Sequence, residues 1–491
     1  MQRSEAVLLT LILALAAGLI YGRLTTGHDW GDDFAGYIGQ AKSIAEGNVH
    51  SYLEQNEITI HNSNTARRQI GPVAYPWGYP LLLAIIYPAC GLDIFCLKLL
   101  NIPIYLLFLL VLYFLLKRHL TTTESLLIVG LFAVNPSFLT YQDFVLSDIP
   151  FMLFSTLAVW LAECALQDER AKNSPVFQAG LGVALFFAFS VRTVGILIVA
   201  AFFAVQSLQI TMHYWKTGKF YVTYQTLIPY LVFGVLILVS NVLLPERIGA
   251  YISELRITRK DILYNLWYYQ SRAFHFFSTL PAFLQLSWAL VGLALIGMVL
   301  TFPRSPIFVL YMLATLGLYV VWPFPSTRFL FGIAPFTVYF AYYPIRYGLS
   351  RLPGIHATGR TTLLAALLLT LGVHFVWHAA TIVRDNLLKD RAFPDGPFTP
   401  QSAELFSYIR EQTPPDGGII FFKPRLLTLL TGRIAWVFND CESLNGIDSV
   451  ASIKDERFSS PNAEALETCN PEMNPEIVFE NGLFIVYKGK Y

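Results

Sequence analysis

The sequence AVLLTLILALAAGLIY at residues 6–21, followed by GDDFAGY at residues 31–37, decides the fold of this chain. The first stretch is apolar and uncharged, and a lipid-exposed backbone must satisfy its own hydrogen bonds, so it predicts a membrane-spanning helix. The second stretch places Asp32 and Asp33 just beyond this helix, at a membrane boundary. An amphipathic segment follows the two carboxylates. We therefore expect a membrane scaffold built around this acidic corner.

The composition indicates a multi-pass α-helical membrane protein. Of the 491 residues, 55% are hydrophobic and 14% are charged, whereas soluble domains carry about 25% charged residues. A net charge of +1 argues against nucleic acid as a partner. We expect about eleven transmembrane helices, near residues 6–22, 97–116, 124–142, 149–166, 176–191, 193–209, 222–244, 283–301, 306–322, 329–346 and 361–380.

Basic residues orient these spans, because cytoplasmic loops are enriched in lysine and arginine. The basic residues fall on alternate connections, at 117–119, 170–172, 213–219, 304 and 346–360. This pattern predicts a multi-pass protein of the cell (inner) membrane, surrounded by membrane lipid, with a cytoplasmic N-terminus. The acidic corner and the C-terminal region are then extracytoplasmic.

Two domains are expected. Residues 1–383 form the transmembrane domain, with a first outer loop at 22–95 and a second at 245–281. Residues 384–491 change composition and predict a small extracytoplasmic α/β domain. Its signals are a capped helix opening at Thr399-Pro400, a buried strand at 419–422, and a hairpin around Asn481-Gly482.

The five cysteines do not form a CxxC pair, which argues against a metal site. They are Cys90, Cys96, Cys164, Cys441 and Cys469. Cys441 and Cys469 both lie in the predicted outer domain, where they form either a disulfide or two free thiols.

Asp32 and Asp33 are the first candidates for chemistry. They can cap the following helix, which contributes about 1 kcal/mol, and a carboxylate there can also act as a general base toward a hydroxyl. Helical spacing puts Asp33, Tyr37 and Gln40 on one face.

Three more charged residues are expected at the same outer face. Asp148 opens a span in Ser147-Asp148-Ile149-Pro150, where it either caps the helix or serves a functional site. Arg192 interrupts an apolar run, and Arg328 follows Pro325-Ser326-Thr327. Outward arginines are unexpected under the positive-inside rule, so we expect Arg192 and Arg328 to hold an anionic group such as a phosphate, unless they only extend to the interface.

These motifs resemble the GT-C superfamily of integral-membrane glycosyltransferases, nearest to its protein O-mannosyltransferase and aminoarabinose-transferase branch. The resemblance rests on Asp32-Asp33 with Tyr37, on 75–81 (YPWGYPL), on 147–150 (SDIP), on 191–195 (VRTVG), and on Arg328-Phe329 with Pro335. It runs from about residue 30 to about residue 345. A lysine that usually accompanies the aromatic-proline segment is replaced here by Trp77-Gly78, which shifts phosphate recognition toward the arginines.

The resemblance implies a GT-C-like catalytic domain that transfers a sugar, with inversion, from a polyprenyl-phosphate donor on the outer face. The catalytic acid of the family precedes a tyrosine by four positions, which selects Asp33 as general base. Asp32 is then the second catalytic residue, as its neighbour or as a helper on the donor side. Tyr37, Tyr75, Trp77, Asp148, Arg192 and Arg328 are then substrate-binding residues. We expect neither a metal nor another cofactor, because the lipid-linked sugar is a substrate. The acceptor is a lipid, a glycan or a protein.

Two other functions fit parts of the sequence. A transporter or flippase of lipid-linked sugars would need a polar path through the spans. A non-catalytic scaffold would use the outer domain to recruit a partner, with the acidic corner only as a helix cap.

Overall fold

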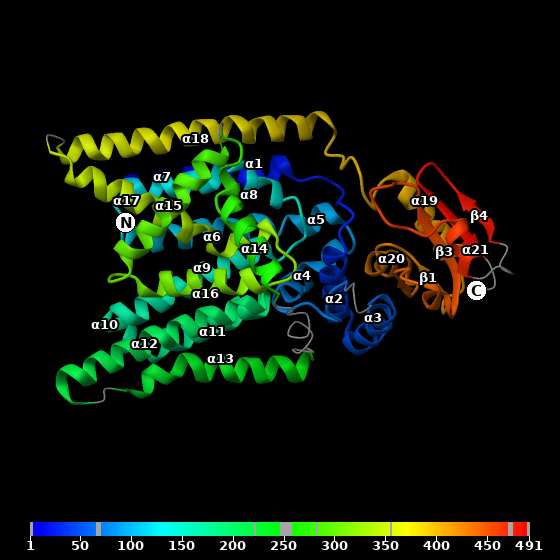
Figure 1. Ribbon diagram of the computed structural model, residues 1–491, viewed down its shortest axis with the longest axis horizontal. Helices are drawn as coiled ribbons and strands as arrows, with labels where there is room; N and C mark the ends of the chain where they lie inside the picture. The colour runs from blue at the N-terminus through cyan, green and yellow to red at the C-terminus, as the bar shows by residue number, and fades with distance from the viewer. Residues whose placement is uncertain are drawn as a thin grey trace.

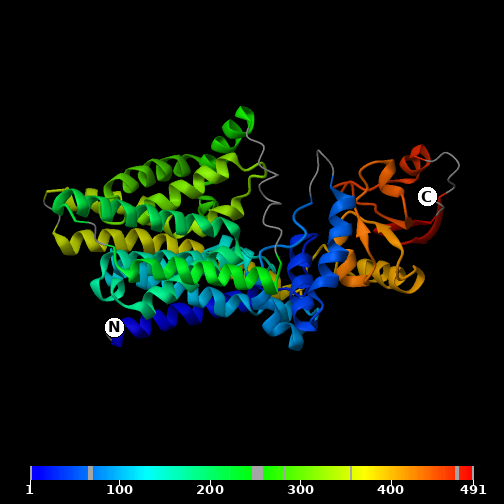
Figure 2. The same ribbon diagram turned by 90° about the horizontal axis from the view of Figure 1, so that it is seen from below.

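The computed structural model describes residues 3–64, 70–219, 222–245, 258–280, 283–353, 356–469 and 475–488. Residues 246–257 of the predicted second outer loop lie outside this described part. Figures 1 and 2 show a bundle of long helices, with a small sheet domain beyond one of its ends. The helices α2 (Asp33–Glu46) and α3 (Val49–Ser63) lie between the bundle and the sheet domain in both views.

The chain is a multi-pass membrane protein. In the described residues, six helical stretches are long and apolar enough to cross a membrane: Arg3–Arg23, Ile94–Lys117, Asp148–Gln167, Thr193–Thr217, Tyr224–Leu243 and Thr358–Leu388. Five shorter apolar helices accompany them. Each of the eleven predicted ranges contains helix, while the number that crosses the membrane stays a prediction. The bundle helices are α1 (Arg3–Arg23), α6 (Asn101–Lys117), α7 (Thr122–Val134), α9 (Asp148–Gln167), α11 (Pro175–Val191), α12 (Ile196–Thr217), α13 (Tyr224–Leu243), α15 (Phe283–Thr301), α16 (Pro306–Val321), α17 (Ala334–Arg351) and α18 (Ala357–Leu388).

Some of the predicted spans are not single helices. The range 124–142 is divided at Asn135, whose side chain caps the separate helix α8 (Pro136–Tyr141) by accepting from Ser137 N at 2.9 Å. An asparagine followed by a first-turn proline is a helix-start signal. The sequence therefore contains a local signal for this division, although one continuous span was predicted. The range 329–346 begins in the 3₁₀ helix η4 (Thr327–Ile333), which carries Arg328, before α17. The apolar helix α4 (Gly78–Cys90) was not among the predicted spans.

The end of the bundle near the N-terminus is rich in ion pairs. Glu5 in the first turn of α1 pairs with Lys117. Glu163 Oε2 lies 3.3 Å from Arg118 Nε. These contacts gather predicted cytoplasmic groups at one end, while Asp33 lies at the other.

A buried ion pair fixes the path from α1 to the acidic corner. The carboxylate of Asp143 accepts from Lys98 Nζ at 2.8 Å, and both side chains are fully buried. The same carboxylate accepts from Thr25 N at 2.7 Å and from Arg23 Nη1 at 3.0 Å. Because a buried charge is costly unless it is paired and hydrogen-bonded, this cluster holds the segment after α1 in one conformation.

The C-terminal domain is a five-stranded sheet with helices packed on it. The strand order is β2-β1-β3-β5-β4, with β1 parallel to β2 and β3, and β5 antiparallel to β3 and β4. The strands are β1 (Gly418–Ile420), β2 (Ala435–Trp436), β3 (Ile447–Ile453), β4 (Glu476–Glu480) and β5 (Phe484–Lys488). The helices are α19 (Pro400–Gln412), α20 (Pro424–Thr431) and α21 (Ala463–Cys469). The predicted helix at Thr399-Pro400, the buried strand and the hairpin are confirmed.

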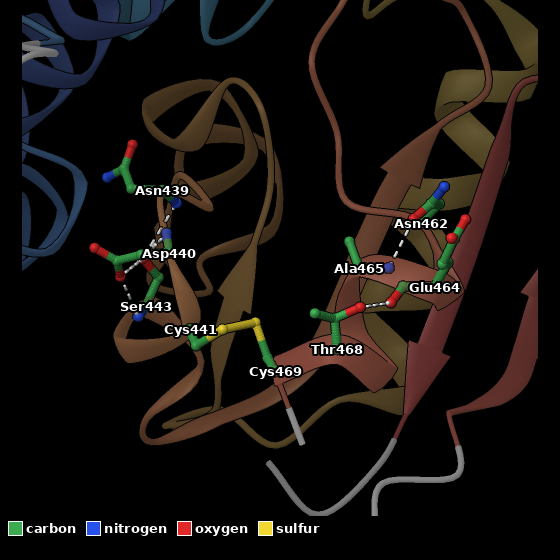
Figure 3. The surroundings of a disulfide bond; sticks show 9 residues. All are labelled: Asn439, Asp440, Cys441, Ser443, Asn462, Glu464, Ala465, Thr468 and Cys469. Atoms are coloured by element: carbon green, nitrogen blue, oxygen red, sulfur yellow. Dashed lines mark hydrogen bonds between the residues drawn. A yellow bond between two sulfur atoms is a disulfide. The ribbon is translucent and has the colours of Figure 1, made fainter. Parts of the chain in front are cut away.

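Four of the five cysteines form disulfides. Cys441 and Cys469 are bridged, which decides between the two alternatives left by the sequence, and the bridge ties η5 (Cys441–Leu444) to the end of α21 (Figure 3). Cys90 and Cys96 form a second disulfide across the turn between α4 and α5 (Ile94–Lys98), which the sequence analysis did not predict. Cys164 is a buried free thiol.

Trp30 joins the sheet domain to the acidic corner. Its ring lies 5.1 Å from Phe422 and 6.0 Å from Phe484, measured between centroids. Its indole N–H donates to the Asp395 carboxylate at 3.0 Å. A single hydrophobic cluster therefore contains residues of α2, of α4 and of the sheet.

Candidate active site

Helix α2 begins at Asp33, so the two adjacent carboxylates occupy its first positions. Asp32 is the N-cap residue, yet within the described chain its side chain makes no capping hydrogen bond. The side chain of Ser147, the N-cap residue of α9, makes none either. Helix capping therefore does not account for the side chains of Asp32 and Ser147.

The Asp33 carboxylate is held by two donors. Tyr75 Oη donates to Oδ1 at 2.8 Å, and Arg328 Nη2 donates to Oδ2 at 3.1 Å. The Asp33 side chain nevertheless remains 39% exposed. Each carboxylate oxygen accepts more than one hydrogen bond, so Asp33 is fixed in place and can still accept from a ligand hydroxyl.

Asp148 connects the two predicted arginines. Arg192 Nη1 donates to Asp148 Oδ1 at 2.8 Å, and Arg328 Nη1 lies 3.9 Å from Asp148 Oδ2. The Arg192 guanidinium also stacks over the ring of Phe329 at 5.3 Å. Asp33, Arg328, Asp148 and Arg192 thus form a row of alternating charge. Arg192 is paired inside this row and does not extend alone to the interface.

The expected common face of α2 is confirmed by its contacts with Tyr75. Besides the bond from Tyr75 to Asp33, the ring of Tyr37 lies 4.7 Å from the Tyr75 ring. The Gln40 amide donates to Tyr75 O and accepts from Tyr75 N, both at 2.9 Å. Tyr37 Oη also pairs with Ser147 Oγ at 2.9 Å, next to Asp148. The face therefore fixes both the Tyr75 backbone and its hydroxyl.

The aromatic-proline segment lies in the wall of the site. Trp77 is fully buried at the start of α4, so its ring offers no free face to a ligand in this conformation. A Cβ on Gly78 would lie 2.6 Å from the Ser190 carbonyl carbon and 2.7 Å from Val191 N. Only glycine lets α4 approach the end of α11 this closely, which sets the position of Arg192.

Arg425 enters the site from the C-terminal domain. It lies in the first turn of α20 and is buried. Its Nη1 donates to Tyr75 Oη at 2.8 Å and lies 3.6 Å from Asp32 Oδ2. It also donates to the carbonyls of Ile70 and Pro72. The sheet domain thus supplies a group that acts on Tyr75, and through it on Asp33.

The pKa values of the two adjacent carboxyl groups are shifted in opposite directions. Burial alone would raise the pKa of Asp33, but the Arg328 guanidinium and the hydrogen bond from Tyr75 outweigh it and lower that pKa. Burial raises the pKa of Asp32, and the nearby Arg425 does not offset it. Environments that separate the pKa values of two neighbouring acids assign them different roles. The neighbours of Asp33 therefore favour its ionised form, whereas burial disfavours the ionised form of Asp32.

A cavity of about 580 Å³ adjoins this row of charges. Arg328 lines it together with Asp29, Thr140, Tyr141, Phe144 and His275. The lining mixes aromatic rings with a few polar groups, as ligand sites do. Arg328 is therefore shared between the cavity and Asp33.

Comparison with known proteins finds similar folds. A family model described as dolichyl-phosphate-mannose-protein mannosyltransferase matches residues 72–244. The structure is similar to crystal structures of ArnT from Cupriavidus metallidurans in the apo state, with a TM-score of 0.63, 12% identity and 97% of each chain covered. It is similar to the same protein bound to undecaprenyl phosphate, with a TM-score of 0.61, 12% identity, and 99% of this chain and 98% of that chain covered.

The chain has the GT-C fold. The apo oligosaccharyltransferase of Archaeoglobus fulgidus matches as well, with a TM-score of 0.52, 11% identity, and 91% of this chain and 69% of that chain covered. No curated protein sequence matches the chain.

The GT-C fold brings most of the predicted site residues together. Asp32, Asp33, Tyr37, Tyr75, Asp148, Arg192 and Arg328 are linked by the contacts above, and Trp77 is buried beside Gly78. The analysis of the sequence assigned no role to Arg425 or Asp29. Arg425 follows Lys423-Pro424, a helix-start signal, but its partners lie about 350 residues away in the sequence.

Proposed function

We propose that this protein is an inverting glycosyltransferase that moves a sugar from a polyprenyl-phosphate donor to a hydroxyl acceptor. The observation that carries the proposal is the Asp33 carboxylate, held by Tyr75 and by Arg328, which also lines the 580 Å³ cavity that we assign to the donor. The GT-C fold and the family-model match support it. The structural match to ArnT bound to undecaprenyl phosphate supports a donor with a polyprenyl-phosphate portion.

In this proposal Asp33 is the general base. The acceptor oxygen attacks the anomeric carbon while its proton moves to the Asp33 carboxylate. The bond from the anomeric carbon to the phosphate oxygen breaks, and polyprenyl phosphate leaves as an anion from the opposite face. Because a phosphate leaving group needs little protonation, one carboxylate suffices where glycosidases canonically use two. Asp32 is less suited to this role, because both of its carboxylate oxygens are buried, whereas the Asp33 side chain is 39% exposed.

Arg328 is the residue best placed to stabilise the leaving phosphate. It lines the cavity and its side chain is 26% exposed, whereas that of Arg192 is 17% exposed. Arg192 stays engaged with Asp148, so it acts mainly by holding Asp148, which in turn orients Arg328. A preorganised guanidinium contributes to catalysis because it needs no reorganisation as charge develops.

The reaction takes place on the outer face in this proposal. The basic clusters near the N-terminus would face the cytoplasm, and the C-terminal domain would be extracytoplasmic. The acceptor is a lipid, a glycan or a protein, and no cofactor is assigned a role.

The test compares two substitutions of neighbouring carboxylates. In purified protein supplied with a labelled polyprenyl-phosphate sugar and a membrane extract as acceptor source, Asp33→Asn lowers transfer by about 10²–10⁴-fold. Asp32→Asn serves as the matched control and keeps most of the activity, because the hydrogen bonds that hold Asp33 come from Tyr75 and Arg328 and not from Asp32. Full activity of Asp33→Asn in a folded protein would overturn the proposal, and vesicle translocation of the donor without transfer would favour a flippase.

A further inference from the structure

A second cavity, of about 220 Å³, lies between α2, α3 and α20. From the structure we infer that it binds one sugar ring of the hydroxyl acceptor. This inference rests on the proposed function, because it names the substrate class that the base would act on. The transmembrane domain supplies two of the cavity's walls, and the C-terminal domain supplies the third.

The cavity occupies a different face of α2 from the one that contacts Tyr75. Ala35, Gly39, Lys42 and Glu46 line it at helical spacing. One turn before Ala35, the same row reaches Asp32. The row of α2 that contacts Tyr75 begins at Asp33. The two adjacent carboxylates therefore begin two different rows of α2, and the row that follows Asp32 lines this cavity.

The lining chemistry fits a polyhydroxyl group. Ser51, Gln55 and Asn48 contribute hydroxyl and amide groups, and Lys42 and Glu46 contribute one charge of each sign, while the Arg425 guanidinium in the lining is already close to Asp32. Each sugar hydroxyl both donates and accepts hydrogen bonds, so a lining that alternates donors with acceptors suits it better than it suits an anion. The size also fits, because sites for drug-sized ligands measure about 300–1,000 Å³, and 220 Å³ suits a smaller group.

The cavity is bordered by buried polar atoms that need a partner. Among the described residues, Arg425 Nε and Thr428 Oγ1 are buried without a hydrogen bond, and both residues line the cavity. Arg425 is 4% exposed as a whole. Buried polar groups are nearly always satisfied, so these two atoms at the border of the cavity favour a polar occupant over an apolar one.

Arg425 also connects the two sites. One face of it lines the cavity, while its Nη1 bonds Tyr75 Oη, which donates to Asp33. A sugar ring that contacts Arg425 in the cavity is thus linked to the proposed base through Arg425 and Tyr75. Gly39 keeps this wall close, because a Cβ there would lie 2.8 Å from the Tyr52 ring.

The test is protection of an engineered thiol, which needs no turnover. The native cysteines are either bridged or buried, so Ser51→Cys creates an exposed reactive thiol in the cavity lining. We expect methyl hexosides at millimolar concentration to slow its labelling by a maleimide about threefold or more, as occupancy of a small site would. Glu54→Cys, exposed on the same helix but outside the lining, is the matched control and is not protected.

Inorganic phosphate forms the second arm of this experiment. Protection by phosphate alone, or by neither probe, overturns the inference. Labelling needs no catalysis. In the double variant Asp33→Asn with Ser51→Cys, methyl hexosides therefore slow the labelling of the thiol as much as they do in Ser51→Cys alone. A failure of the proposed base is thereby distinguished from a failure of this cavity.

A kinetic comparison adds a second readout. Gln55→Ala raises the acceptor KM about tenfold, as the loss of ligand hydrogen bonds does, and leaves the donor KM and donor hydrolysis unchanged. Glu54→Ala, its neighbour outside the cavity, changes neither. An equal rise of both KM values in Gln55→Ala would indicate a general disturbance of the fold and would count against the inference.

Discussion

Arg425 Nη1 donates a hydrogen bond of 2.8 Å to Tyr75 Oη, although the two residues are 350 positions apart and belong to different domains. Tyr75 Oη in turn donates to Asp33 Oδ1 at 2.8 Å. The C-terminal domain is therefore part of the machinery that orients the proposed base. This relationship gives the sheet domain a role beyond recruitment of a partner.

Tyr75→Phe removes the hydroxyl and keeps the ring. Hydrogen bonds to charged groups contribute about 1.5–3 kcal/mol, so we expect kcat to fall by about tenfold to a hundredfold. A hydrogen bond to the ionised form lowers the pKa of a carboxyl. Its loss raises the pKa of Asp33, and the acidic limb of the kcat/KM profile moves to higher pH.

The matched control for that variant is Tyr79→Phe. Among the described residues, Tyr79 Oη is buried without a hydrogen bond, so its removal leaves both the rate and the pH profile unchanged. A Tyr75→Phe enzyme whose pH profile coincides with that of the unmodified protein would contradict the assignment of Asp33 as base.

Arg425→Met leaves the Asp32 carboxylate buried without its nearest cation. Breaking a buried pair costs about 3–5 kcal/mol, so thermal unfolding in detergent occurs at a lower temperature. Asp32→Asn, added to Arg425→Met, restores much of the stability because no unpaired charge remains. It does not restore kcat, since Tyr75 still lacks its partner. Recovery of both quantities together would show that Arg425 acts through stability alone.

Local sequence patterns predicted those parts of the site that lie on one helix or at a helix end. Asp33, Tyr37 and Gln40 were placed together by helical spacing, and Arg192 by its interruption of an apolar run. The partners of these groups could not be predicted in this way. Arg425 reaches Tyr75 only because the sheet domain docks on α2 through Trp30 and Phe421, and such docking leaves no periodic signal in the sequence.

The disulfides illustrate the same limit. The bridge between Cys90 and Cys96 depends on how the turn after α4 folds back, and spacing alone did not indicate it. In contrast, the break at Asn135 was predictable, because an asparagine followed by proline is a local helix-start signal. Features that are set by a few adjacent residues can be predicted from the sequence. Contacts that form only through tertiary packing cannot.

The two arginines of the charged row should differ in their effects. Arg328→Gln removes a bond to Asp33 and a wall of the donor cavity, so we expect the donor KM to rise and kcat to fall, together by about 10²-fold or more. It also raises the pKa of Asp33, because the largest cation effect on that carboxyl is lost. Arg192→Gln lowers kcat less and leaves the donor KM nearly unchanged, since Arg192 acts through Asp148.

Steady-state kinetics with varied donor concentration separates the two cases. Arg272→Gln is the control, because Arg272 stacks on Tyr268 and its guanidinium takes no part in the charged row. If Arg328→Gln and Arg328→Ala both left the donor KM and kcat unchanged, the phosphate role of Arg328 would fail. A larger rise of the donor KM in Arg192→Gln would transfer that role to Arg192.

The disulfides should contribute unequally to stability, because they close loops of different length. The bridge from Cys441 to Cys469 spans 28 positions, and the bridge from Cys90 to Cys96 spans 6. If a disulfide stabilises by restricting the unfolded chain, the longer bridge contributes about 3–4 kcal/mol to the free energy of unfolding and the shorter one about 2–2.5 kcal/mol. Cys441→Ser with Cys469→Ser therefore lowers the unfolding temperature of the C-terminal domain more than the corresponding pair of substitutions at 90 and 96 lowers that of the protein.

The longer bridge should also affect activity, because Arg425 belongs to the domain that it stabilises. Loosening the sheet domain weakens the contact from Arg425 to Tyr75, so the 441/469 double variant loses activity at a lower temperature than the 90/96 variant does. Cys164→Ala, which removes the buried free thiol of α9, is the control without a bridge. Differential scanning calorimetry measures the unfolding temperature, and parallel transfer assays measure the temperature at which activity is lost. Activity that outlasts unfolding of the sheet domain would show that Asp33 keeps its orientation without Arg425.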